Sequence, residues 1–209
     1  MYKDLFDSMV QKLETAGATI LKNETDPILT AGELKIREES FQTTFPDWVL
    51  KLYGEQNGLL RRWELKQNDI SLSGFINLYS FERMYIYSHE KQQLWEDWYK
   101  EEDIERIKKH CILEQILGDD SYITVKFLPE NKYELYYVGE DYVNDGGSED
   151  LPKIPLTIEQ YIKVITGYYG VYGICHHLYK DEFYKNPFDV YPKLRELEQM
   201  FPDFEPPTI

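Results

Sequence analysis

The chain has 209 residues, of which 42% are hydrophobic and 15% aromatic, so it can bury a sizeable core and wholesale disorder is excluded. Thirty-eight acidic and 23 basic residues give a net charge of −15, which disfavours binding to nucleic acid or anionic lipid because neutralising phosphate requires clustered Lys and Arg. No stretch approaches the roughly 20 apolar residues that span a bilayer, a signal-peptide pattern is lacking, and two cysteines are too few for a disulfide framework, so we expect a soluble, cytoplasmic protein.

The N-terminal part of the chain predicts helices. Apolar residues at helical spacing predict a first helix (Leu5, Phe6, Met9, Val10, Leu13). Gly17 and residues 23–27 then indicate a break or loop, and residues 30–41 a second amphipathic helix. Pro46 suits the first turn of a third helix, where its missing N–H costs nothing, and Asn57–Gly58 is expected to end that helix through left-handed backbone geometry.

The middle of the chain predicts strands and then a long helical segment. Residues 60–65 alternate between two dissimilar faces, which is typical of a strand. Residues 70–79 favour either a pair of strands or one strand that enters a loop at Gly74. From Ser88 to Leu117 the chain is charged and free of Gly and Pro, which favours one helix or two helices joined near Glu101.

A hairpin and a capped helix are expected further along. Alternating residues from Tyr122 to Val138 flank the polar turn 129–132, which is typical of a β-hairpin. The acidic stretch from Gly139 to Asp150 is expected to form a solvated loop. Thr157, followed three residues later by Gln160, predicts a capping box at the start of a helix with an apolar stripe (Ile158, Tyr161, Ile162, Ile165).

The fold class follows from this order of elements. Residues 168–179 are apolar and fit no single element, and a short helix is expected after Pro192. The sequence contains no internal repeat and no low-complexity linker. We therefore expect one α+β domain over residues 1–209, with an antiparallel or mixed sheet packed by helices, a long helical insert, and a helical C-terminal extension over residues 169–209.

The stretch Phe45–Gly58 (FPDWVLKLYGEQNG) resembles the opening motif of the SUKH superfamily, in which an apolar residue and Pro precede an apolar helix and Asn-Gly. Residues 74–79 are similar to a family strand, and the order of elements matches over about residues 31–168. The chain departs from the pattern where Phe45 replaces the usual Leu and where Leu59 replaces a second Gly. The long segment from Ser88 to Leu117 is a further departure.

The SUKH superfamily includes fungal cell-wall assembly regulators and many bacterial toxin-immunity proteins. The resemblance implies a binding module that blocks a cognate toxin, commonly an enzyme with a basic substrate-binding cleft. An acidic chain would attract such a basic domain by electrostatic steering. The family motif is structural, so the resemblance implies no catalytic residues, and we expect neither enzymatic activity nor a cofactor.

Cys175, His176 and His177 form the most suggestive local cluster for chemistry. A zinc site needs three or four ligands that converge, whereas adjacent histidines point in different directions, and no CxxC or HExxH motif accompanies them. A cysteine nucleophile would need a histidine base and an orienting group, which Cys111 or Cys175 with His89 or His177 would have to provide. The sequence favours packing, with one exposed imidazole, over a metal or catalytic site.

Aromatic and acidic residues that follow the predicted hairpin are the candidate partner-binding residues. Tyr side chains supply large contact area at a low entropy cost in interfaces, and we expect these residues to be exposed. They are Tyr137, Glu140, Asp141, Tyr142, Asp145, Glu149 and Asp150.

Three functions are therefore compatible with the sequence. The first is an immunity protein or related protein-binding module with an acidic surface. The second is a regulatory scaffold of the same fold that binds an endogenous partner. The third is an enzyme or small-molecule-binding protein with a site near Cys175–His177, which would require those side chains to converge in a pocket.

Overall fold

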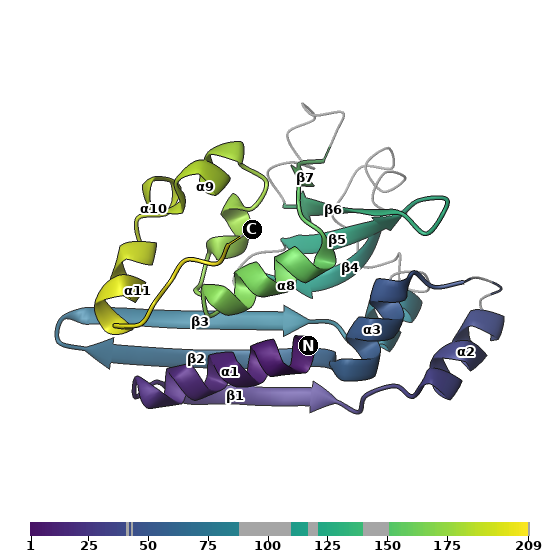
Figure 1. Ribbon diagram of the computed structural model, residues 1–209, viewed down its shortest axis with the longest axis horizontal. Coiled ribbons are helices and arrows are strands. Elements are labelled where there is room, and N and C mark those ends of the chain that lie inside the picture. Colours follow the sequence, from purple (N-terminus) through teal and green to yellow (C-terminus); the bar gives the residue numbers. More distant parts are fainter. Residues whose placement is uncertain (41, 43, 88–109, 117–120, 140–150, 209) are drawn as a thin grey trace.

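The computed structural model describes residues 1–40, 42, 44–87, 110–116, 121–139 and 151–208 (Figure 1). Its elements in the first half of the chain are α1 (Tyr2–Thr15), β1 (Thr19–Asp26), α2 (Ala31–Ser40), α3 (Asp47–Glu55), β2 (Asn57–Gln67), β3 (Ile70–Leu78) and the π-helical turn η1 (Glu82–Tyr87). The second half contains β4 (His110–Gln115), β5 (Tyr122–Phe127), β6 (Tyr133–Val138), β7 (Lys153–Ile154), α8 (Ile158–Gly167), the 3₁₀ turn η2 (Ile174–His177), α9 (Asp181–Lys185), α10 (Pro187–Val190) and α11 (Leu194–Met200).

The seven described strands form one antiparallel sheet in which their spatial order follows the chain order, so the predicted α+β class is confirmed. Strands β2 and β3 form a long hairpin, but β3 and β4 pair only between Leu78 and Glu114. The N-terminal half of β3 instead forms a bridge between Gly74 and Val171. The sheet therefore opens between β3 and β4, and residues that follow α8 fill the opening.

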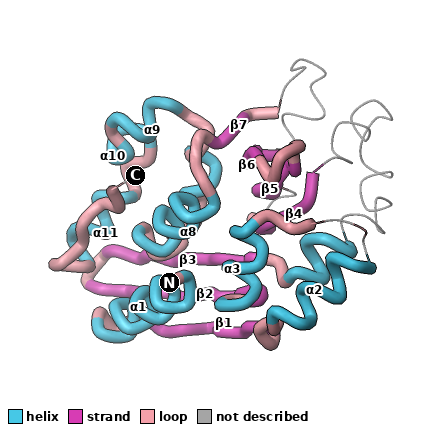
Figure 2. The backbone as a smooth tube through the Cα atoms, turned by 45° about the vertical axis from the view of Figure 1, so that its right-hand side comes forward, coloured by secondary structure: helices cyan, strands magenta, loops and turns pink. Residues whose placement is uncertain are grey.

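One face of the sheet carries the core and is covered by α1 and α8, which lie side by side (Figures 1 and 2). Strand β2 directs Leu59, Trp63 and Leu65 toward this face, whereas Arg62 and Lys66 on the alternate positions are exposed. Their exposure agrees with the alternation predicted from residues 60–65. A strand with one buried face is fixed in register, because a shift by one residue would expose the whole apolar set.

Arg61 is the charged residue that β2 directs into this core. Its side chain is 4% exposed, its Nη1 donates to the Phe6 carbonyl oxygen at 3.1 Å, and its Nε and Nη2 donate to Asn23 Oδ1 at 3.1 and 2.7 Å. Burial lowers the pKa of Arg61 to about 10. The guanidinium thereby ties α1 and β1 to β2 through neutral acceptors.

Trp63 of β2 packs against Gly74 of β3 and bonds to the segment that follows α8. Trp63 Nε1 donates to the Tyr169 carbonyl oxygen at 2.7 Å. A Cβ at Gly74 would lie 2.1 Å from Trp63 Nε1, so only glycine leaves room for the indole. Gly74 therefore lies inside β3, where close packing requires it, and the alternative of a loop at Gly74 is wrong.

Local sequence signals locate the hairpin and the capped helix correctly. Strands β5 and β6 pair from Tyr122–Val138 to Phe127–Tyr133, and Glu130 and Asn131 adopt positive φ in the turn between them. At the start of α8, Gln160 N–H donates to Thr157 Oγ1 at 3.2 Å, while Thr157 N–H donates to Gln160 Oε1 at 2.9 Å. This reciprocal pair is the predicted capping box.

Two other expectations are wrong. Residues 23–26, expected in a break or loop, belong to β1, which pairs along β2 at the edge of the sheet. Residues 110–115, expected at the end of a long helix, form β4, in which every residue from His110 to Glu114 is buried. The rest of the predicted insert, residues 88–109, lies outside the described residues.

The C-terminal region is helical, with α9 and α10 preceding the expected helix after Pro192, which is α11. Leu194 and Leu197 of α11 are fully buried, and the helix contacts β3. The residues after α8 therefore contribute to the core. Among the described residues, no helix is both long enough and apolar enough to cross a membrane.

Candidate functional site

The Phe45–Gly58 motif lies where α3 leads into β2. Pro46 occupies the position before the first turn of α3, as its missing N–H allows. The helix ends at Glu55, and Gln56 is extended, so Asn57 and Gly58 open the strand. Gly58 does have a positive φ of 71°, but the expectation that Asn57–Gly58 stops the helix is wrong.

Asn57 and Gly58 join three segments of the chain. Asn57 Nδ2 donates to the Pro27 carbonyl oxygen at 2.7 Å, and Asn57 Oδ1 accepts from Phe81 N–H at 2.9 Å. A Cβ at Gly58 would lie 3.0 Å from the Ser80 backbone nitrogen. The polar groups of Asn57 thus find their hydrogen-bond partners within the fold.

Tyr137 is buried, so the expectation that it is exposed is wrong. It is 6% exposed and pairs with Ile123 on the core face of the sheet. Its hydroxyl lies 2.8 Å from His176 Nδ1 and donates to Ser121 Oγ at 3.1 Å. The ring also packs on Tyr179, with centroids 5.2 Å apart. Tyr137 therefore anchors η2 to β6 from a buried position.

The other six candidate partner-binding residues lie outside the described residues (Glu140, Asp141, Tyr142, Asp145, Glu149, Asp150). The strands on either side of them are described. β6 ends at Val138, and β7 returns antiparallel to it, with Lys153 paired to Tyr136. The described strands that precede and follow the acidic segment in the sequence therefore pair with each other.

Cys175, His176 and His177 make their contacts with different partners. Cys175 Sγ lies 3.8 Å from the Tyr161 hydroxyl, and His176 Nδ1 bonds to Tyr137. His177 Nδ1 lies 3.2 Å from Lys180 Nζ, and its ring packs on Tyr191. Both imidazoles are partly buried, so neither is the freely exposed one that we expected.

The buried end of this cluster is a carboxyl group that the sheet supplies. Glu114 in β4 is 2% exposed, and Tyr161 of α8 donates its hydroxyl hydrogen bond to Glu114 Oε2. Glu114, Tyr161 and Cys175 thus form a continuous polar contact from the sheet through α8 to η2. Three segments that are far apart in the sequence meet here.

Burial sets the protonation states of this cluster. It raises the pKa of Glu114 to about 7, against the opposing hydrogen bonds from Tyr161 and the Asn77 backbone. Burial also raises the pKa of Cys175 well above its usual value, and it lowers the pKa of His177 to about 4, with Lys180 adding to the effect. Between about pH 4 and pH 7, Glu114 is therefore a neutral carboxylic acid, Cys175 a thiol and His177 an uncharged imidazole.

This arrangement gives little support to nucleophilic chemistry. A reactive cysteine needs a lowered pKa and access to substrate, whereas Cys175 is buried and its pKa is raised. Cys111 is also buried, and burial raises its pKa to about 12. Within the described ranges, no three His, Cys, Asp or Glu residues are grouped so as to hold a metal ion.

The sequence did not identify Glu114 or Tyr161 as members of a cluster. The charge pattern from Ser88 to Leu117 predicts a helical segment, which would place Glu114 near its end. Tyr161 was recognised only as one residue of an apolar helical stripe. The available signal is the segment His110–Gln115 (HCILEQ), in which Glu114 directly follows a short apolar run. An acid in a buried apolar strand needs a hydrogen-bond partner, which would have pointed to a polar cluster.

Comparison of the chain with protein-family models, with curated proteins and with solved structures finds no match.

Proposed function

We propose that this chain is a protein-binding module that acts as an immunity protein and neutralises a cognate toxin through an acidic surface. The observation that carries the proposal is the net charge of −15. A charge of this size repels phosphate-rich ligands and attracts basic protein domains, whose rate of association rises through electrostatic steering. The resemblance of Phe45–Gly58 to the SUKH motif also supports the proposal, because many SUKH proteins protect a cell by binding a toxin.

The acidic segment from Glu140 to Asp150 is the proposed centre of the binding surface. Within it, Glu140, Asp141, Asp145, Glu149 and Asp150 supply negative charge, and Tyr142 supplies contact area. Tyr137 is removed from this surface because its ring is buried. In the sequence, the segment lies between β6 and β7, which pair with each other.

The experiment is capture of a partner from a lysate of the native host, followed by association kinetics at several salt concentrations. The test variant neutralises the five acids by Glu→Gln and Asp→Asn changes. The matched control neutralises five exposed acids elsewhere, as Asp26→Asn, Glu39→Gln, Asp69→Asn, Asp181→Asn and Glu198→Gln. Both variants lose the same amount of charge, so any difference between them reports on location.

We expect the test variant to associate about tenfold more slowly with the captured basic protein and to lose most of its salt dependence. The control variant should be affected much less. Equal effects of the two variants would show that the segment is not the binding surface. Co-expression distinguishes an immunity protein from a regulatory scaffold, because only the former restores growth to cells that produce the captured protein.

A further inference from the structure

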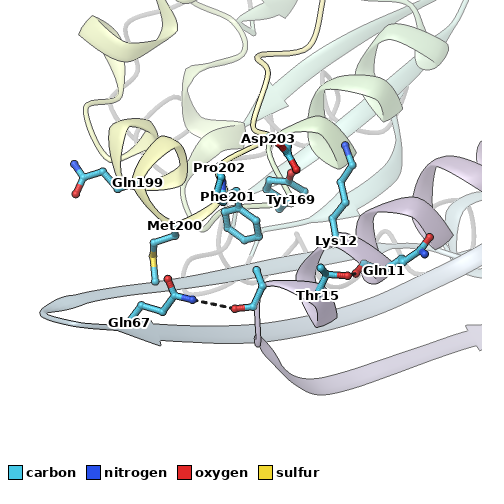
Figure 3. A pocket seen from close by; sticks show the side chains of 11 residues that line it. Gln11, Lys12, Thr15, Gln67, Tyr169, Gln199, Met200, Phe201, Pro202 and Asp203 are labelled. Atoms are coloured by element: carbon cyan, nitrogen blue, oxygen red, sulfur yellow. Dashed lines mark hydrogen bonds between the residues drawn. The ribbon is translucent and has the colours of Figure 1, made fainter.

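A groove of about 590 Å³ lies between the C-terminal turn of α1, the end of β2 and the residues that follow α11 (Figure 3). Its volume is in the range of small-molecule binding sites. Figure 3 shows the Phe201 ring directed into the space between α1 and the C-terminal segment. None of the residues that line the groove belongs to the Glu114 cluster, to β6 or to β7.

The floor of the groove is an aromatic pair held by the core. Phe201 and Tyr169 stack with their centroids 4.4 Å apart, and Phe201 also meets the edge of Trp63. Tyr169 has a φ of 54°, and its carbonyl oxygen accepts the hydrogen bond from Trp63. These contacts fix the floor before any ligand binds, which lowers the entropy cost of binding.

The rim carries one charge of each sign. Lys12 on α1 and Asp203 after α11 both line the groove, and both are exposed. In the part of the chain that the structure describes, neither side chain has an ion-pair or hydrogen-bond partner. Figure 3 shows the ends of both side chains on the same side of the groove. Two opposite charges at one groove match a ligand that itself carries both charges.

Side-chain amides complete the rim. Gln11, Gln67 and Gln199 line the groove, and an amide can both donate and accept hydrogen bonds, as a peptide group does. Gln67 Nε2 donates to the Ala16 carbonyl oxygen at 3.1 Å, which fixes the side chain and leaves its oxygen as an acceptor. The rim therefore offers charge at two points and amide groups around them.

We propose that this groove binds a short peptide of two or three residues with both ends free. Its ammonium group pairs with Asp203, its carboxylate with Lys12, and its peptide groups with the glutamines. An apolar side chain of the ligand rests on the floor formed by Phe201. A polyanion does not fit, because the rim offers one cation on a chain whose net charge is −15.

Isothermal titration calorimetry of the full chain with the tripeptide Gly-Phe-Gly at low ionic strength tests the proposal. The same peptide with an acetylated N-terminus and with an amidated C-terminus removes one charge at a time. We expect the free peptide to bind most tightly, and each blocked form to bind about threefold to fivefold more weakly.

Variants assign each charge to its partner. Asp203→Asn should weaken binding of the free peptide to the level of the acetylated peptide and leave the affinity for the acetylated peptide unchanged. Lys12→Met should behave in the same way toward the amidated peptide. Lys35→Met and Glu39→Gln, on exposed positions of α2 at the other end of the molecule, are the matched controls and should bind as the unaltered chain does (Figure 1).

Two results would overturn the proposal. One is the absence of any saturable heat with the free peptide up to about 10 mM. The other is binding that responds equally to the groove variants and to the α2 controls. A change at Lys12 or Asp203 does not disturb the core because both side chains are exposed, so loss of binding is not explained by unfolding.

Discussion

Replacing Glu114 by Gln should stabilise the protein at alkaline pH and leave it nearly unchanged at acidic pH. The folded state raises the pKa of Glu114 from 4.5 to about 7. Below pH 4.5 both folded and unfolded chains carry the proton. Between pH 4.5 and about pH 7 the folded chain binds this proton more tightly than the unfolded chain does. The free energy of unfolding therefore falls as pH rises from 4.5 to about 7.

The magnitude follows from the size of the shift. Each pKa unit corresponds to about 1.4 kcal/mol, so above pH 7 the buried carboxylate costs about 3 kcal/mol of folding free energy. Gln has the same shape, accepts the hydrogen bond from Tyr161, and does not ionise. We therefore expect Glu114→Gln to match the unaltered chain at pH 4.5 and to exceed its stability by about 3 kcal/mol at pH 8.

Urea unfolding at pH 4.5, 6, 7 and 8, followed by tryptophan fluorescence, measures the difference between the two proteins. His110 and His177, whose pKa values burial lowers to about 4, contribute stability that is lost as pH falls below 6.5. This contribution is shared by both proteins and cancels in the difference. Glu198→Gln, on the exposed side of α11, controls for the removal of one negative charge.

A difference between Glu114→Gln and the unaltered chain that stays constant from pH 4.5 to 8 would refute the reasoning. It would mean that Glu114 keeps an ordinary pKa inside the fold. Greater stability of the unaltered chain at pH 8 would refute it more strongly, because the carboxylate would then be stabilised where it lies.

Three further substitutions test how the fold is held together. Gly74→Ala places a Cβ 2.1 Å from Trp63 Nε1 and should lower the free energy of unfolding by about 3 kcal/mol in urea titrations; a loss below about 0.5 kcal/mol would contradict the close approach. Asn23→Asp gives the buried Arg61 a charged acceptor and should raise stability by about 1 kcal/mol in thermal melts despite adding a negative charge, so a lower melting temperature would count against it. Thr157→Ala removes the capping box of α8 and should cost about 1 kcal/mol, whereas Thr157→Ser should restore most of it.

Sequence reasoning located the elements whose signals are local. The capping box needs only Thr157 and Gln160, and the hairpin needs only alternation around a short polar turn. β1 was missed because its residues are almost all exposed and lack an apolar face. Only its pairing with β2 shows that this segment is a strand. β4 was missed for the opposite reason, since burial on both faces removes the alternation that marks a strand.

The direction of a side chain in a strand was the weakest prediction. Tyr136 and Tyr137 are adjacent in β6, so one must face the core and the other must face away. The register with β5, where Tyr137 pairs with Ile123, decides between them. The same limit applies to Glu114, because its contact with Tyr161 depends on how α8 packs over the sheet.

The two proposals concern different residues, so each can be tested without altering the other. The acidic segment lies between β6 and β7 in the sequence, whereas the groove is lined by residues of α1, β2 and α11 and by residues that follow α8 and α11. Changing Lys12 and Asp203 together removes one charge of each sign and leaves the net charge at −15. Because long-range steering follows the overall and local charge, this double variant should associate normally with a basic partner. Slower association would place the groove within the partner surface. The natural occupant of the groove would then be a chain end of the partner protein, which the free peptide mimics.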